Sequence, residues 1–95
     1  MDITISGQHF ELTPAIRTYA EEKLTKLAHH LDNIMSIHVV LKVEQTRSVS
    51  HIAHADIHVK GGALNAKAEA GDMYSAIDLL VEKLNQQARK FKEKH

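Results

Sequence analysis

The chain has 95 residues, of which 43% are hydrophobic and 25% are charged, and its 12 acidic and 12 basic side chains give a formal net charge of zero. This length and composition predict one folded domain over residues 1–95 with a single core, and they argue against a disordered chain. The absence of cysteine excludes disulfides and thiolate metal sites, and no apolar run approaches the roughly 18 residues of a membrane span, so we expect a cytoplasmic protein without a membrane partner.

A short strand and a long helix are predicted at the start of the chain. Ile3 and Ile5 alternate with polar residues, which is typical of a strand with one apolar face. Thr13 stands immediately before Pro14, the arrangement of an N-cap followed by proline at the first helical position. Apolar residues then recur every three or four positions, which predicts a helix with one buried face that runs to about Leu31.

Three strands are predicted in the middle of the chain, where hydrophobic and polar residues alternate along residues 34–44, 53–60 and 63–70. A polar stretch between the first two suits a hairpin loop. The two glycines at 61–62 can both take the positive φ that a two-residue turn demands. We therefore expect Lys60 opposite Ala63 and Val59 opposite Leu64, a register that keeps the apolar face continuous.

The last quarter of the chain predicts an amphipathic helix from Asp72, a good N-cap, to His95. Its apolar stripe consists of residues at helical spacing, namely Met73, Ile77, Leu80, Leu84, Ala88 and Phe91. Lys83, Lys90 and Lys94 line up along one flank of that stripe. The simplest interpretation is a solvated helix whose lysines keep the protein soluble; the alternative is a binding surface.

The element order is β-α-β-β-β-α, which predicts an α+β fold of two layers. We expect a four-stranded mixed sheet with both helices on its apolar face and its polar face left to solvent. The first strand should lie parallel to the second through a right-handed crossover, and the remaining strands should form an antiparallel meander. The α-β-β-β-α portion has the element order of double-stranded RNA-binding domains, an analogy at the level of the fold only.

Charge is segregated along the chain although its total is zero. Residues 83–95 contain five cations and one anion, giving +4, while residues 1–82 contain seven cations and eleven anions, giving −4. Lys23, Lys26 and His30 add a basic edge to the first helix. Because both helices lie on one sheet face, these basic flanks can meet as one surface. Such a surface suits a polyanion, and an acidic protein surface would suit it equally well.

Catalytic and metal-binding patterns are not found in the sequence. His54 and His58 share a strand face but lie about 13 Å apart, too far to hold one ion; a cross-strand pair of His38 with either remains open, yet surface histidines are far commoner than metal sites. No nucleophile–base pair, facing carboxylates or phosphate-cradling glycine loop can be read from the spacing. We therefore expect a protein that is not an enzyme and that has no metal and no cofactor.

The sequence resembles the ribosome hibernation promoting factors, the short form of the ribosome-associated inhibitor family. The resemblance covers the whole chain and rests on the run DMYSAIDLLVEKLNQQARKFKEK, on GGALNAKAEAGDMY before it and on HVVLKVE. It implies a single ribosome-binding domain over residues 1–95 that occupies the decoding channel of the small ribosomal subunit. It also implies that messenger and transfer RNA are blocked and that inactive ribosome dimers accumulate in stationary phase or stress.

The resemblance also implies partners and contact residues. Long family members add a C-terminal dimerisation domain, so we expect this chain to be a monomer off the ribosome and to act there with a separate ribosome modulation factor. Family positions that lie against ribosomal RNA match Lys23 and Lys26 of the first helix and Lys83, Lys90 and Lys92 of the last. Gln86 stands where relatives commonly carry arginine, and Arg89 is a candidate to replace that charge from another direction.

The candidate RNA-binding residues from both arguments are Lys23, Lys26, His30, Lys83, Gln86, Arg89, Lys90, Lys92 and Lys94. Two alternatives stay open at this point. One is a general double-stranded RNA-binding module, and the other is an interaction domain whose basic helix docks an acidic protein.

Overall fold

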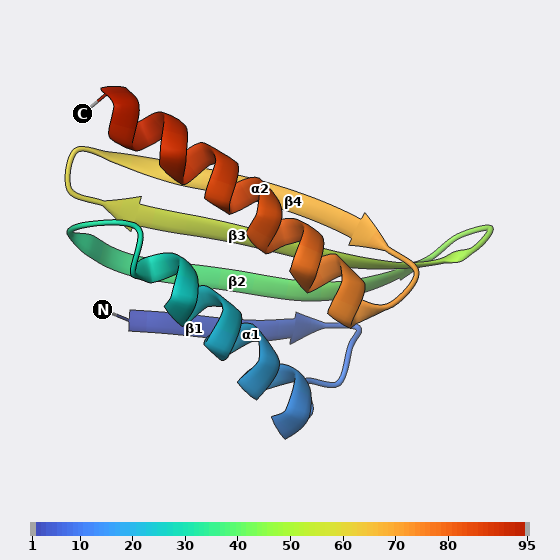
Figure 1. The fold of residues 1–95 in the computed structure, drawn as a ribbon. Coiled ribbons are helices and arrows are strands. Elements are labelled where there is room, and N and C mark those ends of the chain that lie inside the picture. The colour runs from blue at the N-terminus through green and yellow to red at the C-terminus, as the bar shows by residue number, and fades with distance from the viewer. Residues whose placement is uncertain (1, 95) are drawn as a thin grey trace.

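The computed structural model describes residues 2–94, except for the side chain of Lys94. Its elements, in chain order, are β1 (Asp2–Gln8), α1 (Pro14–Ala28), β2 (Ile34–Gln45), β3 (Val49–Val59), β4 (Gly62–Ala70) and α2 (Met73–Lys94). The strands form one sheet in the order β1-β2-β3-β4, with β1 parallel to β2 and the other neighbours antiparallel. Figure 1 shows both helices on one face of this sheet, so the predicted two-layer α+β fold is confirmed.

Both helices begin where the sequence predicts. Thr13 accepts a hydrogen bond from the Ile16 N–H at 3.2 Å, and Pro14 follows it in the first turn of α1. At the start of α2, one carboxylate oxygen of Asp72 accepts the Ser75 N–H at 3.0 Å and the other accepts the Ser75 hydroxyl at 2.7 Å. These bonds to Ser75 lower the pKa of Asp72 and satisfy donors that a helix terminus leaves free.

Helix α1 ends at Ala28, three residues before the predicted end at Leu31. The next three N–H groups, of His29, His30 and Leu31, bond to carbonyls three residues back, which tightens the last turn. Asn33 then takes a left-handed φ of 59° and turns the chain into β2. Leu31 nevertheless stays buried. The apolar periodicity therefore predicted its place in the core correctly, but it did not predict where the helix ends.

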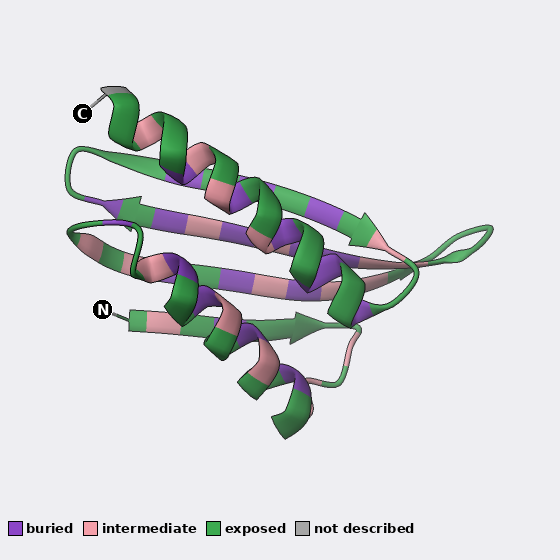
Figure 2. Cartoon of the chain, in the orientation of Figure 1, coloured by how far each residue is buried: buried purple, intermediate pink, exposed green. Residues whose placement is uncertain are grey.

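The core lies between the sheet and the helices, as the buried stripes in Figure 2 show. It is built from the alternating positions of the strands and from the helical stripes predicted from sequence. The most deeply buried large side chains of this core are Leu24, Leu27, Ile37, Val39, Leu41, Ile57, Ile77, Leu80 and Leu84. All are aliphatic, and no polar side chain is buried among the residues that the structure describes.

The predicted register of the β3–β4 hairpin is wrong by two residues. Val59 pairs with Gly62, so the turn consists of Lys60 and Gly61, and of the two glycines only Gly61 has positive φ, at 92°. A shift of two residues leaves the same side chains on each face, which is why the alternation could not exclude it. Gly62 has a different role, because a Cβ placed there would lie 2.9 Å from a ring carbon of Phe91.

The open sheet face is mostly polar but is not wholly left to solvent. Ile52 lies on this face, between Lys42 and Glu69 in the register, and is only 2% exposed. The predicted description of this face as solvent-exposed is therefore wrong at Ile52. Elsewhere on it, the rings of His38 and His58 lie 6.4 Å apart, and across residues 2–94 no group of three or more histidine or acidic side chains is placed to hold a metal ion.

Candidate nucleic-acid interface

A polar and aromatic cluster joins the first half of α2 to α1. The Tyr19 hydroxyl donates to Asp78 at 2.5 Å, and Lys23 Nζ lies 3.7 Å from the same carboxylate. The hydrogen bond to Asp78 raises the pKa of Tyr19. Tyr74 packs edge-on against Tyr19, with ring centroids 4.9 Å apart. This cluster fixes the face of α2 that looks toward α1, and it pairs Lys23, a predicted RNA contact, with Asp78.

The opposite side of α2 covers the free edge of β4. The Gln87 amide accepts the Asn65 N–H at 3.2 Å and donates to the Asn65 carbonyl at 2.6 Å. Lys83 Nζ donates to the carbonyl of Lys67 at 2.7 Å. These side chains satisfy backbone groups that an edge strand would otherwise expose for pairing with another chain.

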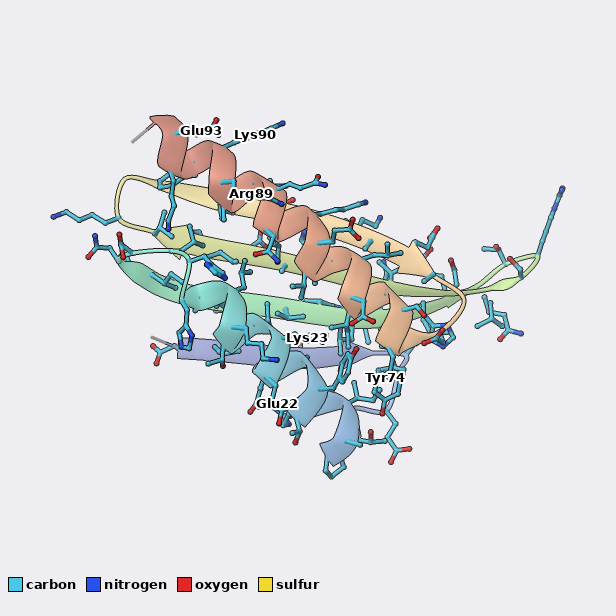
Figure 3. All side chains as sticks on the ribbon, in the orientation of Figure 1. Glu22, Lys23, Tyr74, Arg89, Lys90 and Glu93 are labelled. Atoms are coloured by element: carbon cyan, nitrogen blue, oxygen red, sulfur yellow. The ribbon has the colours of Figure 1, made fainter. Side chains whose placement is uncertain are left out.

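A basic groove follows this β4 edge. It has a volume of about 450 Å³ and is lined by Lys67, Lys83, Gln86 and Lys90, with Asn65, Ala66 and Gln87 completing its wall. Lys67 reaches this groove through its backbone carbonyl, which accepts from Lys83, a contact that sequence reasoning missed. The Lys67 side chain lies on the open sheet face with that of His54, its partner in the register. We name Lys83, Gln86 and Lys90 the edge cluster. Figure 3 shows Lys90 pointing away from α1, toward this side.

A second basic groove lies between the two helices. It encloses about 340 Å³ and is lined by His30, Asn85, Ala88, Arg89 and Lys92. We name His30, Arg89 and Lys92 the interhelix cluster. Two cations and a histidine thus converge on one groove.

The predicted site residues are therefore divided between the two sides of α2. Lys83, Gln86 and Lys90 face β4, whereas Arg89 and Lys92 face α1 and meet His30. The single surface expected from Lys83, Lys90 and the α1 residues does not form as predicted, since α2 stands between them. Lys26 lies exposed on the outer part of α1 beside Glu22 and Thr25. The side chain of Lys94 lies outside the described residues.

Most of these cations have no anionic partner. Three ion pairs occur in the part of the chain that the structure describes, Arg17–Glu21, Lys23–Asp78 and Lys42–Glu44. No member of the edge cluster or of the interhelix cluster takes part in these ion pairs. Cations without carboxylate partners are available to neutralise phosphates, and release of counterions from those phosphates would drive binding.

Comparisons with known proteins show the family of this chain. A family model described as Sigma 54 modulation protein / S30EA ribosomal protein matches residues 3–95. The chain belongs to this family. The Ribosome hibernation promoting factor of Klebsiella oxytoca is 45% identical over 94 residues, which cover 99% of this chain and 96% of that protein. The predicted resemblance to the hibernation promoting factors is thereby confirmed.

Solved structures related to this S30EA family member share its fold. A ribosomal subunit interface protein from Coxiella burnetii superposes with a TM-score of 0.85 at 33% identity, over 98% of this chain and 99% of that one. The N-terminal domain of Protein Y from Thermus thermophilus gives 0.84 at 33% identity, over 96% and 99%. No helix among the described residues is long and apolar enough to cross a membrane.

Proposed function

We propose that this protein is a cytoplasmic ribosome hibernation factor that binds the small ribosomal subunit through the helix layer. The observation that carries the proposal is the placement of cations without carboxylate partners on both sides of α2, with Lys83 and Lys90 along β4 and Arg89 and Lys92 toward α1. The names of the relatives, which are ribosome hibernation promoting factors and a ribosomal subunit interface protein, supply the partner. Residues 1–95 act as a single ribosome-binding domain.

The proposed mechanism is occupancy without catalysis. The domain fills the decoding channel, and its cations hold ribosomal RNA phosphates, which positions the protein without reading sequence. Messenger and transfer RNA are then excluded because their space is taken. The protein is a monomer off the ribosome and acts with a separate ribosome modulation factor to favour inactive ribosome dimers in stationary phase or stress.

The fold suits this role because the cations sit on a rigid support. Leu80, Leu84 and Ala88 anchor α2 in the core, while the hydrogen bonds of Gln87 and Lys83 fix it along β4. A surface that is already ordered loses little conformational entropy on binding. The attraction between these cations and phosphates therefore contributes to affinity, because little free energy is lost in ordering the helix.

The experiment compares three ligands under the same conditions: the intact small subunit, a free RNA duplex and an acidic protein surface. We expect the subunit to bind most tightly, the duplex weakly, and both to weaken steeply as salt rises. Saturating messenger and transfer RNA should displace the protein from the subunit. Equal affinity for duplex and subunit would favour a general RNA-binding module, and preference for the acidic protein would refute the proposal.

A further inference from the structure

The helix layer presents one exposed tyrosine or phenylalanine ring among the described residues, at the start of α2. Tyr74 is 42% exposed, unlike the aromatic residues of a core. Figure 3 shows it on the first turn of α2, with Lys23 on α1.

The ring of Tyr74 is held in place by its neighbours. Met73 immediately before it and Ala76 two residues after it are buried, and Asp72 caps the helix turn that carries it. Its partner ring, Tyr19, is in turn tied to Asp78. A ring positioned in this way offers a flat apolar surface at low entropic cost, since an aromatic side chain has only two χ angles to fix.

At least one flat side of Tyr74 is free of Tyr19. The planes of the two rings meet at 82°, so Tyr74 offers either its edge or one of its faces to its partner. In the first case both faces of Tyr74 are clear of Tyr19, and in the second the opposite face is clear. An exposed aromatic face is the group on which single-stranded RNA stacks its bases.

The charges around the ring favour a base over a phosphate. The nearby Asp78 carboxylate would repel a phosphate, but it is compensated by Lys23 and by the Tyr19 hydroxyl, and a carboxylate accepts hydrogen bonds from base amino groups. The unpaired cations lie further along α2. Arg89 is 15 residues beyond Tyr74, which is about 22 Å along a helix.

We propose that Tyr74 stacks an unpaired nucleobase of the RNA whose phosphates lie against the basic second half of α2. The inference rests on the proposed function and adds a base contact to it. The helix layer then has two parts: the edge and interhelix clusters hold phosphates, and the ring of Tyr74 selects RNA that offers an unstacked base over a fully paired duplex.

The test uses tyrosine fluorescence, because the chain has two tyrosines and no tryptophan. In a Tyr19→Phe variant, Tyr74 is the only emitter. Single-stranded oligo(A) and an abasic oligomer of equal length carry the same phosphate charge, but only oligo(A) has bases. We expect oligo(A) to quench the fluorescence of Tyr74 and the abasic oligomer to bind without quenching it. A parallel titration of free tyrosine amide corrects for the light that adenine absorbs.

Affinity gives the second measurement, with two substitutions at the same position. Tyr74→Phe keeps the ring and should bind oligo(A) like the parent, whereas Tyr74→Leu should lose about five-fold to a hundred-fold. Neither change should alter binding of the abasic oligomer. Because the position is exposed, both variants should keep the parent circular dichroism spectrum.

The possible outcomes separate the inference from the function on which it rests. If both oligomers bind equally and Tyr74 is not quenched, the base contact is wrong while phosphate binding stands. If neither oligomer nor the small subunit binds, the proposed function fails and the inference falls with it. As a further probe, an arginine-rich peptide stands in for a protein partner. If Tyr74→Leu weakens binding of this peptide and leaves binding of oligo(A) unchanged, the ring contacts protein, and the inference is overturned.

Discussion

Removing two lysines of the edge cluster should reduce the salt dependence of RNA binding by a defined amount. Lys83 and Lys90 line one groove and neither pairs with a carboxylate among the described residues. Each phosphate contact contributes about 0.7 to 0.9 to the slope of log K against log salt, for single strands and duplexes respectively. The double variant Lys83→Gln/Lys90→Gln should therefore lower the slope for small-subunit binding by about 1.4 to 1.8.

The measurement is the dissociation constant for the small subunit at several salt concentrations, by sedimentation or fluorescence anisotropy. The matched control removes the same charge from cations that already have partners, Arg17→Gln/Lys42→Gln, whose carboxylate contacts are 4.0 Å and 2.8 Å. The control should leave the slope within error of the parent. Equal slopes for the parent and the Lys83/Lys90 variant, with the fold intact, would refute the assignment of the edge cluster.

Three further predictions address the groove, the hairpin and the helix cap. Gln86→Arg adds a cation between existing ones in the edge groove, so it should tighten subunit binding and steepen the salt slope by about 0.7 to 0.9; an unchanged slope would place Gln86 outside the interface. Gly62→Ala forces its Cβ to 2.9 Å from Phe91 and should destabilise by about 1–3 kcal/mol in urea unfolding, whereas Gly71→Ala, with no atom within 4 Å, should not. The lowered pKa of Asp72 means that its carboxylate stabilises the fold above its unfolded pKa near 3.8 and that this stability is lost as the pH falls through the folded value. Asp72→Asn should thus be less stable at neutral pH, and the difference should vanish in acid; a constant difference in thermal melts would contradict this.

Short-range sequence patterns predicted most of the fold. Thr13 and Asp72 cap helices because their side chains reach backbone N–H groups only three residues ahead. The strand alternation likewise placed Ile37 and Leu41 in the core. Such features depend on short stretches of chain, so one sequence suffices to read them.

Features that depend on how elements cross were not predictable in the same way. The hairpin register is consistent with the packing of Phe91 over Gly62, a contact between residues 29 positions apart. The Lys67 carbonyl accepts from Lys83 only because α2 lies along β4. The side of α2 on which each cation lies is periodic, but which side faces α1 is decided by contacts such as Tyr19 with Asp78.

The most direct test asks which face of the protein lies against ribosomal RNA. Because the chain has no cysteine, a single engineered cysteine can carry a tethered iron chelate that cleaves nearby RNA. Gln86→Cys places the probe on the helix layer, and His58→Cys places it on the open sheet face; both positions are exposed. With both variants bound to small subunits, we expect strong cleavage of the RNA from position 86 and weak cleavage from position 58. Equal cleavage, or stronger cleavage from position 58, would refute binding through the helix layer.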